Sequence, residues 1–526
     1  MSHRRQWLIV LTVLLVLAAV IGREVYARLI APAAPLNFDE AAHSLPGFYL
    51  LRDSRNLDLR AFWGDFHIQT LWPPMFSILQ APFLAVFGRT DESVRAFAYV
   101  MLVATLLLAC VLAHQIDRTL APPAALIAGL ITLSAPGWLF VSSWAMQETP
   151  VAFMTFAAFC VFLRALSSGR IAWYAAASSA LFLLFLTKYN YAAFALAAVA
   201  CVDLAMRLRS RDLSLGTLCA LYVPFALGLL AWFYTDTAGI SAFNSVKWRD
   251  FAFFVSNEDS GYVFWSEQNL LYYVRASGDW LMPHWLVLAA VLAAAGYALR
   301  RVRHPGVALL AIFFGLGFVL ATAHPLKSQR YITPIFPSLW LLAGLGLAAW
   351  ARDRARMRLV LVVALAVALG SGSFWLPRLQ PVWAGHLADD MRAATDQIVR
   401  WQDGAKPVLI IGTFGELSPP LFEWRLRPLP AFANNPAVQY DAPPRDAKDD
   451  IERVQKWIGE NPGAQVTLID VDESSALFTT ADMQTKNVWK QKIVARFDEV
   501  RGYRKIDERH FPESGLTISF WRRDEP

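Results

Sequence analysis

The feature that most constrains this chain is a series of long apolar segments between residues 7 and 375. A membrane-crossing helix needs about 20 mostly apolar residues. The segments lie near residues 7–30, 94–113, 122–141, 150–166, 171–187, 191–206, 214–234, 281–299, 305–323, 332–350 and 358–375. They predict a polytopic α-helical membrane protein with eleven spans or close to it.

Composition excludes a set of soluble domains. Of the 526 residues, 56% are hydrophobic, and the mean hydropathy is +0.38. The four cysteines lie in or beside apolar segments, so neither a disulfide framework nor a cysteine metal site is expected. The basic start followed by an apolar run also fits a cleaved signal peptide, which would leave the sidedness of the later segments unchanged.

Basic residues between the segments predict the orientation in the membrane. Positive turns face the cytoplasm, and the arginine-rich turns alternate with turns that hold few cations. They contain Arg118, Arg164, Arg170, Arg207, Arg209, Arg211, Arg300, Arg301, Arg303, Arg352, Arg354, Arg356 and Arg358. The N-terminus is therefore expected in the cytoplasm. The loops 31–93 and 235–280 and everything after residue 375 are expected outside.

Two domains are predicted: a membrane domain over residues 1–375 and an extracytoplasmic domain over 376–526. In the second, residues 406–411 and 465–469 are typical of short buried strands. Residues 446–458 favour an amphipathic helix, and residues 516–521 an edge strand. A small α/β domain is expected, and it has no glycine-rich phosphate loop.

Ionisable residues are almost absent from the predicted spans but gather at their outer ends. An ion-coupled carrier would need such groups near the bilayer midplane. The outer residues with side chains suited to an active site are Asp39, Glu40, His43, His67, Gln147, Glu148, Lys188, Tyr189, Asn190, His324, Lys327, Arg330 and Tyr331. Acidic and basic residues from segments distant in sequence are thus expected at the same outer surface of the membrane.

Each group also has a purely structural interpretation. Asn37 and Glu40 fit a helix cap with its capping box, and Pro73 and Pro74 fit a helix start. Residues 147–150 fit a solvated turn. Lys188 and Arg330 fit interfacial anchors that reach the lipid headgroups, and His43 and His67 fit ordinary loop histidines.

The motifs together resemble the GT-C superfamily of polytopic glycosyltransferases that use polyprenyl-phosphate sugars. The similar branch is the protein O-mannosyltransferase and lipid A aminoarabinose transferase type. The motifs are Phe38-Asp39-Glu40-Ala41, Leu71-Trp72-Pro73-Pro74-Met75, Phe87-Gly88-Arg89-Thr90 with Arg95, and His324-Pro325-Leu326-Lys327-Ser328-Gln329-Arg330-Tyr331-Ile332-Thr333-Pro334. Aminoarabinose transferases carry a lysine where this chain has Trp72, which argues against that particular sugar.

The resemblance implies that Asp39 acts at the acceptor hydroxyl. Chemistry supports this, because displacing a phosphate at the anomeric carbon needs a base for the acceptor and cations for the departing charge. Such a single displacement inverts the anomeric configuration. Substrate contacts are expected from Glu40, His43, Glu148, Lys188, Tyr189, Lys327, Arg330 and Tyr331.

No cofactor is required for certain. A divalent cation is compatible with the sequence, with Asp39, Glu40 and Glu148 as candidate ligands. The expected partners are a polyprenyl-phosphate-linked sugar, a glycan, lipid or protein acceptor, and membrane lipids, with no nucleic acid. The resemblance places such a protein in the bacterial cytoplasmic (inner) membrane, in cell-envelope glycan or lipopolysaccharide modification. The loop 243–280, rich in aromatic residues, favours an interfacial helix that either lines the donor groove or rests on the bilayer.

Two other functions remain open on sequence grounds: a flippase or other transporter of lipid-linked sugars, and a non-catalytic assembly subunit that docks through its tail. The charge-free spans count against transport.

Overall fold

The computed structural model describes most of the chain. The described residues are 2–66, 73–211, 214–235, 266–324, 327–381, 384–402, 406–412, 419–426, 438–440, 456, 458–461, 463–471, 497, 500 and 502–523. The chain divides into two compact units. The helical unit is Met1–Ile30 with Pro46–Leu379, and the tail unit is Ala31–Leu45 with Gln380–Pro526.

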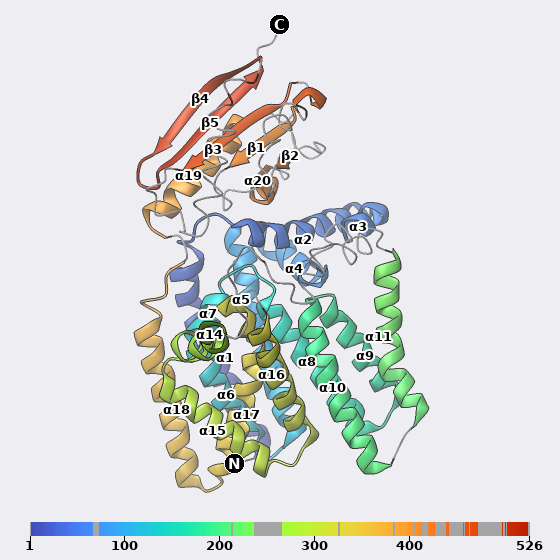
Figure 1. Ribbon diagram of the computed structural model, residues 1–526. Helices are drawn as coiled ribbons and strands as arrows, with labels where there is room; N and C mark the ends of the chain where they lie inside the picture. Colours follow the sequence, from blue (N-terminus) through green and yellow to red (C-terminus); the bar gives the residue numbers. More distant parts are fainter. Residues whose placement is uncertain are drawn as a thin grey trace. The chain divides into compact units, whose positions relative to one another are not determined.

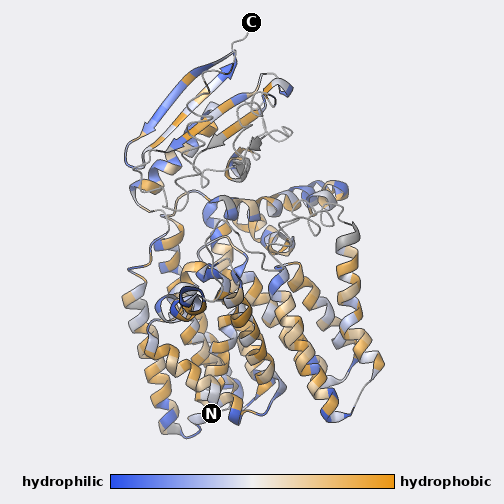
Figure 2. Ribbon diagram, viewed as in Figure 1, coloured by the Kyte–Doolittle hydropathy of each residue, from blue (hydrophilic) through white to orange (hydrophobic). Residues whose placement is uncertain are grey.

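The helical unit is built from apolar helices joined by short turns (Figures 1 and 2). Its first elements are α1 (His3–Val25), η1 (Tyr26–Ile30), α2 (Phe38–Asn56, shared with the tail unit), α3 (Leu59–Phe66), α4 (Met75–Phe87), α5 (Asp91–Ile116), α6 (Ala121–Ser134), α7 (Pro136–Val141) and α8 (Glu148–Ser168). Those that follow are α9 (Ile171–Phe185), α10 (Tyr189–Ser210), α11 (Leu215–Thr235), α14 (Glu267–Ala276), η3 (Ser277–Leu281), α15 (Trp285–Arg301), α16 (Pro305–Ala323), η4 (Gln329–Ile335), α17 (Phe336–Trp350) and α18 (Arg354–Trp375).

The expected count of eleven spans is not confirmed. Each predicted segment is helical over most of its length. By length and composition, however, seven of the described helices can cross a membrane, or eight if the pair 267–281 and 285–301, bent by 108°, is one span. The segment at 122–141 breaks at Ala135, because Pro136 starts the new helix α7. The polar stretch 31–93 folds into α2, α3 and α4.

Helix α17 forms the centre of the helical unit. Of its apolar window, 94% is buried. A methyl group on Gly344 would collide with the carbonyl oxygen of Ala124 in α6, and one on Gly346 would collide with that of Ala294 in α15. Glycine is therefore required at both positions, where small residues let helices approach closely. This packing fixes η4, the 3₁₀ segment that leads directly into α17.

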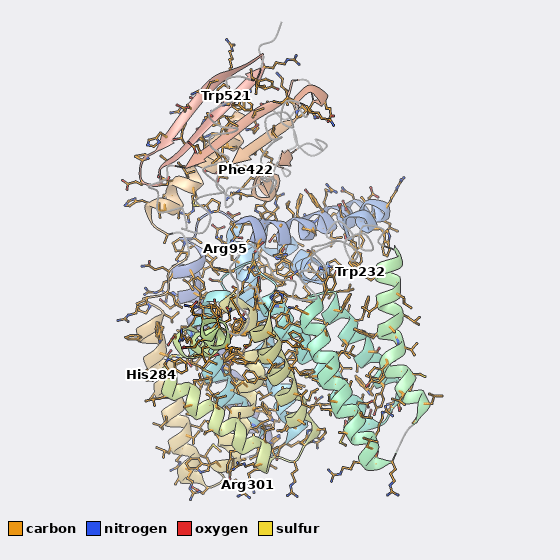
Figure 3. All side chains as sticks on the ribbon, in the orientation of Figure 1. Arg95, Trp232, His284, Arg301, Phe422 and Trp521 are labelled. Carbon is orange, nitrogen blue, oxygen red and sulfur yellow. The ribbon has the colours of Figure 1, made fainter. Side chains whose placement is uncertain are left out.

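The two ends of the helical unit differ in charge. Figure 3 places Arg301 at the end where Figure 1 marks the N-terminus, and Trp232 toward the other end. Helix α10 has basic residues, including Arg207 and Arg209, in its last turn, whereas Lys188 immediately precedes its first turn.

The tail unit contains a five-stranded mixed sheet in the order β2-β1-β3-β5-β4. Its elements are α19 (His386–Trp401), β1 (Val408–Gly412), α20 (Pro419–Leu426), β2 (Val438–Tyr440), β3 (Gln465–Val471), β4 (Tyr503–Phe511) and β5 (Leu516–Arg523). Strands β1 and β3 pair in parallel, while β3 pairs with β5 and β5 with β4 in antiparallel fashion. The small α/β domain expected from the sequence is present.

One detail of the predicted sheet is wrong. The strand at residues 516–521 exists, but β5 lies between β3 and β4 and is not an edge strand. The strand at that edge of the sheet is β4, whose charged sequence YRKIDERHF suits an exposed strand that must not pair further. The helix expected at 446–458 lies outside the described residues, except for residues 456 and 458. Of the loop 243–280, in which an interfacial helix was expected, residues 243–265 also lie outside them, whereas residues 267–280 form α14 and most of η3.

Candidate functional site

An ion pair buried at the start of α8 anchors the candidate site in the helical unit. Glu148 lies in the first turn of α8 and is 1% exposed. Lys188 immediately precedes α10, and its Nζ lies 3.0 Å from Glu148 Oε1. The interpretation of residues 147–150 as a solvated turn is therefore wrong. Lys188 points to a protein carboxylate rather than to a lipid headgroup.

A second cation, Arg330, and two tyrosines, Tyr191 and Tyr331, lie close to this ion pair. The Tyr191 hydroxyl donates to the carbonyl oxygen of Tyr331 in η4, which ties α10 to η4. Lys188 Nζ lies 5.7 Å and Arg330 Cζ 5.4 Å from the centre of the Tyr331 ring. The guanidinium of Arg330 is also within Coulombic range of Glu148. Lys188, Arg330 and Tyr331, predicted from segments more than 140 positions apart, thus come together.

Buried polar atoms surround the ion pair. Glu148 Oε2, both amide atoms of Gln147 and the hydroxyl oxygen of Thr149 are buried and have no hydrogen-bond partner among the described residues. Most buried polar groups in proteins are hydrogen-bonded, and exceptions concentrate where a ligand or water completes the structure. The start of α8 is thus polar enough to receive such a group.

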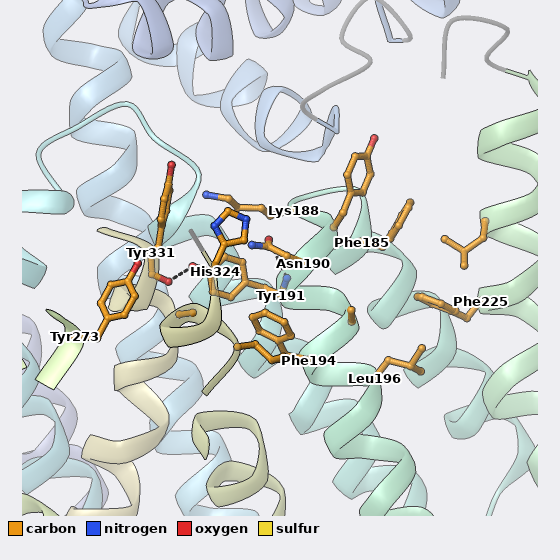
Figure 4. Close-up of a pocket in the computed structure, with 15 residues that line it drawn as sticks. Phe185, Lys188, Asn190, Tyr191, Phe194, Leu196, Phe225, Tyr273, His324 and Tyr331 are labelled. Atoms are coloured by element: carbon orange, nitrogen blue, oxygen red, sulfur yellow. Dashed lines mark hydrogen bonds between the residues drawn. The ribbon is translucent and has the colours of Figure 1, made fainter. Parts of the chain in front are cut away.

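Beside this ion pair lies a cavity of about 490 Å³. Figure 4 shows Lys188, Asn190 and His324 close together, with Leu196 and Phe225 farther to the right. Its lining residues are Phe185, Lys188, Tyr189, Asn190, Tyr191, Ala193, Phe194, Leu196, Phe225, Leu229, Tyr273, Leu320, Ala321, His324 and Tyr331. The cavity therefore joins a polar, cationic end to an apolar one, which suits a molecule with a charged head and a hydrocarbon chain.

Two other predicted site residues, Lys327 and Tyr189, form hydrogen bonds with other parts of the helical unit. Lys327 Nζ donates to the carbonyl oxygens of Ala321 and Thr322 at the end of α16 and lies 5.2 Å from the ring of Tyr273. Burial lowers the pKa of Lys327 to about 8. Tyr189 lines the cavity, and its hydroxyl accepts a hydrogen bond of 3.2 Å from the indole N–H of Trp232.

The predicted acidic motif lies in the tail unit. Glu40 N donates to Asn37 Oδ1 over 2.9 Å, and Asn37 N donates to Glu40 Oε2 over 3.2 Å. This is the reciprocal capping box of the structural interpretation, so the Glu40 carboxylate starts α2. Asp39 is partly exposed in the same turn, and His43, 3% exposed, follows one turn later.

Sequence reasoning missed Tyr191 and Tyr273, which line the cavity. The tyrosines resemble ordinary aromatic residues of a membrane protein, and only tertiary packing turns them toward the cavity. Residues His67 and Trp72 lie outside the described residues. Within the described part of the chain, no three His, Cys, Asp or Glu side chains converge as a metal site.

Comparisons with known proteins show which family and which solved structures this chain is similar to. Residues 72–234 match the dolichyl-phosphate-mannose-protein mannosyltransferase family. The fold is similar to that of ArnT from Cupriavidus metallidurans bound to undecaprenyl phosphate, at 14% identity and a TM-score of 0.59, over 98% of this chain and 97% of ArnT. No curated protein matches the sequence significantly.

Two further solved structures share the fold. The Archaeoglobus fulgidus oligosaccharyltransferase is 12% identical, with a TM-score of 0.53 over 95% of this chain and 79% of that protein. The mycobacterial arabinofuranosyltransferase AftD is 16% identical, with a TM-score of 0.55 over 100% of this chain and 40% of AftD. This chain is a multi-pass membrane protein with the fold of the GT-C glycosyltransferases. Residues 72–234 match the protein mannosyltransferase model, and the fold is similar to that of ArnT, the branch that the motifs resemble.

Proposed function

We propose that this protein is an inverting glycosyltransferase that moves a sugar from a polyprenyl-phosphate donor to an acceptor hydroxyl at the outer face of the membrane. The observation that carries the proposal is the cavity with Lys188 at its polar end and Phe225 toward its apolar end. The solved relatives support it, because ArnT was crystallised with undecaprenyl phosphate and an archaeal oligosaccharyltransferase was solved with dolichol-phosphate.

In the proposed reaction, Lys188, Lys327 and Arg330 hold the donor phosphate. Tyr331 donates a hydrogen bond to it. A guanidinium can grip two phosphate oxygens at once. The Asp39 carboxylate removes the proton from the acceptor hydroxyl, and the acceptor oxygen bonds to the anomeric carbon while the bond from that carbon to the phosphate oxygen breaks. Polyprenyl phosphate is the leaving group. Since charge grows on the phosphate as that bond breaks, the cations stabilise the transition state more than the bound donor.

The proposed orientation follows the basic turns, with the N-terminus in the cytoplasm and the cavity's polar end at the extracytoplasmic side of a bacterial inner membrane. Glu148 keeps Lys188 in place until the donor arrives. His43 and Tyr189 contact sugar or acceptor, and a divalent ion at Asp39, Glu40 or Glu148 is compatible with this chemistry but not required by it.

Binding of the lipid tests the donor assignment. The purified protein is expected to bind undecaprenyl phosphate at least tenfold more tightly than undecaprenol, because hydrogen bonds to charged groups contribute about 1.5–3 kcal/mol each. Arg330→Ala should remove most of this preference, whereas Arg301→Ala, at the opposite end of the helical unit, should keep it. Equal affinity for the two lipids, or an unchanged preference in Arg330→Ala, would contradict the assignment.

Binding should also depend on pH through Lys327. With its pKa lowered to about 8, Lys327 is charged below pH 8 and neutral above it. A phosphate monoester has lost its second proton well below that pH, since its second pKa is about 6. Undecaprenyl phosphate should therefore bind up to about tenfold more weakly at pH 9 than at pH 7. Lys327→Arg stays charged and should flatten this dependence; an identical decline in both proteins would rule out a role for Lys327.

A further inference from the structure

The segment that leads to the acidic motif belongs to the tail unit. Residues Ala31–Leu45 form a compact unit with Gln380–Pro526, although more than 330 residues separate them in sequence. The stretch 31–35 reads APAAP. Its two prolines lack N–H groups and hold the chain extended, so regular secondary structure does not satisfy its carbonyl oxygens.

Arg392 in α19 supplies donors to this stretch. Its Nη2 donates to the carbonyl oxygen of Ala31 over 3.0 Å and to that of Ala33. Its Nη1 pairs with Asp389 Oδ1, one turn earlier in the same helix, over 3.0 Å. One planar guanidinium thus joins a carboxylate of its own helix to two carbonyls of the stretch 31–35, which restrains both the position and the direction of that stretch.

Helix α19 is itself held firmly on the sheet of the tail unit. Asp390 Oδ2 accepts from Ser514 N, in the turn between β4 and β5, over 2.9 Å. The ring of Trp401 stacks on Phe520 of β5, and its indole N–H donates to Asp507 of β4 over 3.1 Å. The donor side chain of Arg392 therefore projects from a rigid frame.

Only five residues separate Ala33 from Asp39. Between them, Leu36 is fully buried and Asn37 closes the capping box with Glu40. The direction in which the chain enters α2 therefore affects where the Asp39 carboxylate points.

We infer that Arg392 is a positioning residue for Asp39. This inference rests on the proposed function, in which Asp39 is the base. A displacement of about 1 Å at a reacting group can cost about a hundredfold in rate. Loss of the two carbonyl contacts should therefore lower turnover without changing how the donor binds in the helical unit.

The test compares Arg392→Gln, Arg392→Lys and Arg400→Gln in the full-length protein. Arg400 lies on the same helix and hydrogen-bonds to the side chain of Gln397, so it controls for loss of a cation from α19. Arg392→Gln is expected to lower kcat by about tenfold to a hundredfold with the donor KM within about threefold of wild type. Arg392→Lys, which keeps a cationic donor, should recover part of kcat, and Arg400→Gln should match wild type.

A double variant shows whether the effect passes through Asp39. In Asp39→Asn the added Arg392→Gln should cause no further loss, because the group that it positions is already gone. Wild-type kcat in Arg392→Gln, or an equal loss in the presence and absence of Asp39, would overturn the inference. Failure of the proposed function is a different result, namely full turnover in Asp39→Asn alone.

Discussion

Lys188→Ala is expected to destabilise the protein strongly and to abolish donor binding. Removing one partner of a buried ion pair leaves an uncompensated charge, which costs about 3–5 kcal/mol, and Glu148 is 1% exposed. The same substitution removes a cation from the polar end of the cavity. Thermal unfolding in detergent and binding of undecaprenyl phosphate measure the two effects.

A double replacement separates these effects. Lys188→Met with Glu148→Leu exchanges the pair for apolar side chains of similar size, a change that is often neutral for stability. This variant should unfold near the wild-type temperature and still fail to bind undecaprenyl phosphate. A double variant that is stable and binds the lipid normally would show that the pair is only structural.

The matched control is the ion pair at the other end of α10. Arg207 Nε lies 2.8 Å from Asp203 Oδ2, and both side chains are buried. Arg207→Ala should destabilise the protein by a similar mechanism but leave the affinity for undecaprenyl phosphate unchanged. Equal loss of lipid binding in both variants would show that Lys188→Ala abolishes binding through unfolding.

Asp39→Asn is expected to remove turnover while donor binding persists. The amide has nearly the shape of the carboxylate but cannot accept the acceptor's proton, and a positioned base contributes about 10²–10⁴-fold to rate. Asparagine also tolerates the first turn of α2, so the capping box between Asn37 and Glu40 should survive. Steady-state release of free polyprenyl phosphate, beside equilibrium binding of the donor, separates the two properties.

His43→Gln is the matched comparison for Asp39→Asn, since it alters the same helix one turn later. It should lower turnover less, because a group that contacts substrate supplies orientation rather than proton transfer. Turnover of Asp39→Asn within a few-fold of wild type would exclude Asp39 as the base.

The membrane organisation was largely predictable from the sequence. Apolar length does not depend on tertiary contacts, and every expected segment is helical over most of its length. The number of membrane spans could not be predicted as well, because hydropathy does not show where a helical segment bends. Pro136 divides one segment, and the stretch from Glu267 to Arg301 turns by 108°.

The site was predictable only in part. The cations Lys188 and Arg330 were identified because they break the charge pattern of the turns. The buried state of Glu148 was not, since its partner is 40 residues away and residues 147–150 have the composition of a solvated turn. Conversely, the capping box of Asn37 and Glu40 is a local pattern, and the sequence described it correctly.

In the tail, β1 and β3 were recognisable as apolar runs flanked by polar turns. Strand β4 was not, because an edge strand with charges on both faces lacks the alternation by which strands are recognised. Since β4 was overlooked, β5 was assigned to the edge of the sheet.

The most direct test of the central claim is the fate of the donor lipid. Wild-type protein in liposomes is given a panel of short-chain polyprenyl-phosphate sugars labelled in the sugar, together with a cell-envelope acceptor fraction. The account predicts that one donor is cleaved, with one free polyprenyl phosphate released per sugar transferred and with inverted anomeric configuration in the product. Movement of intact donor across the bilayer without cleavage, or retention of configuration, would contradict it.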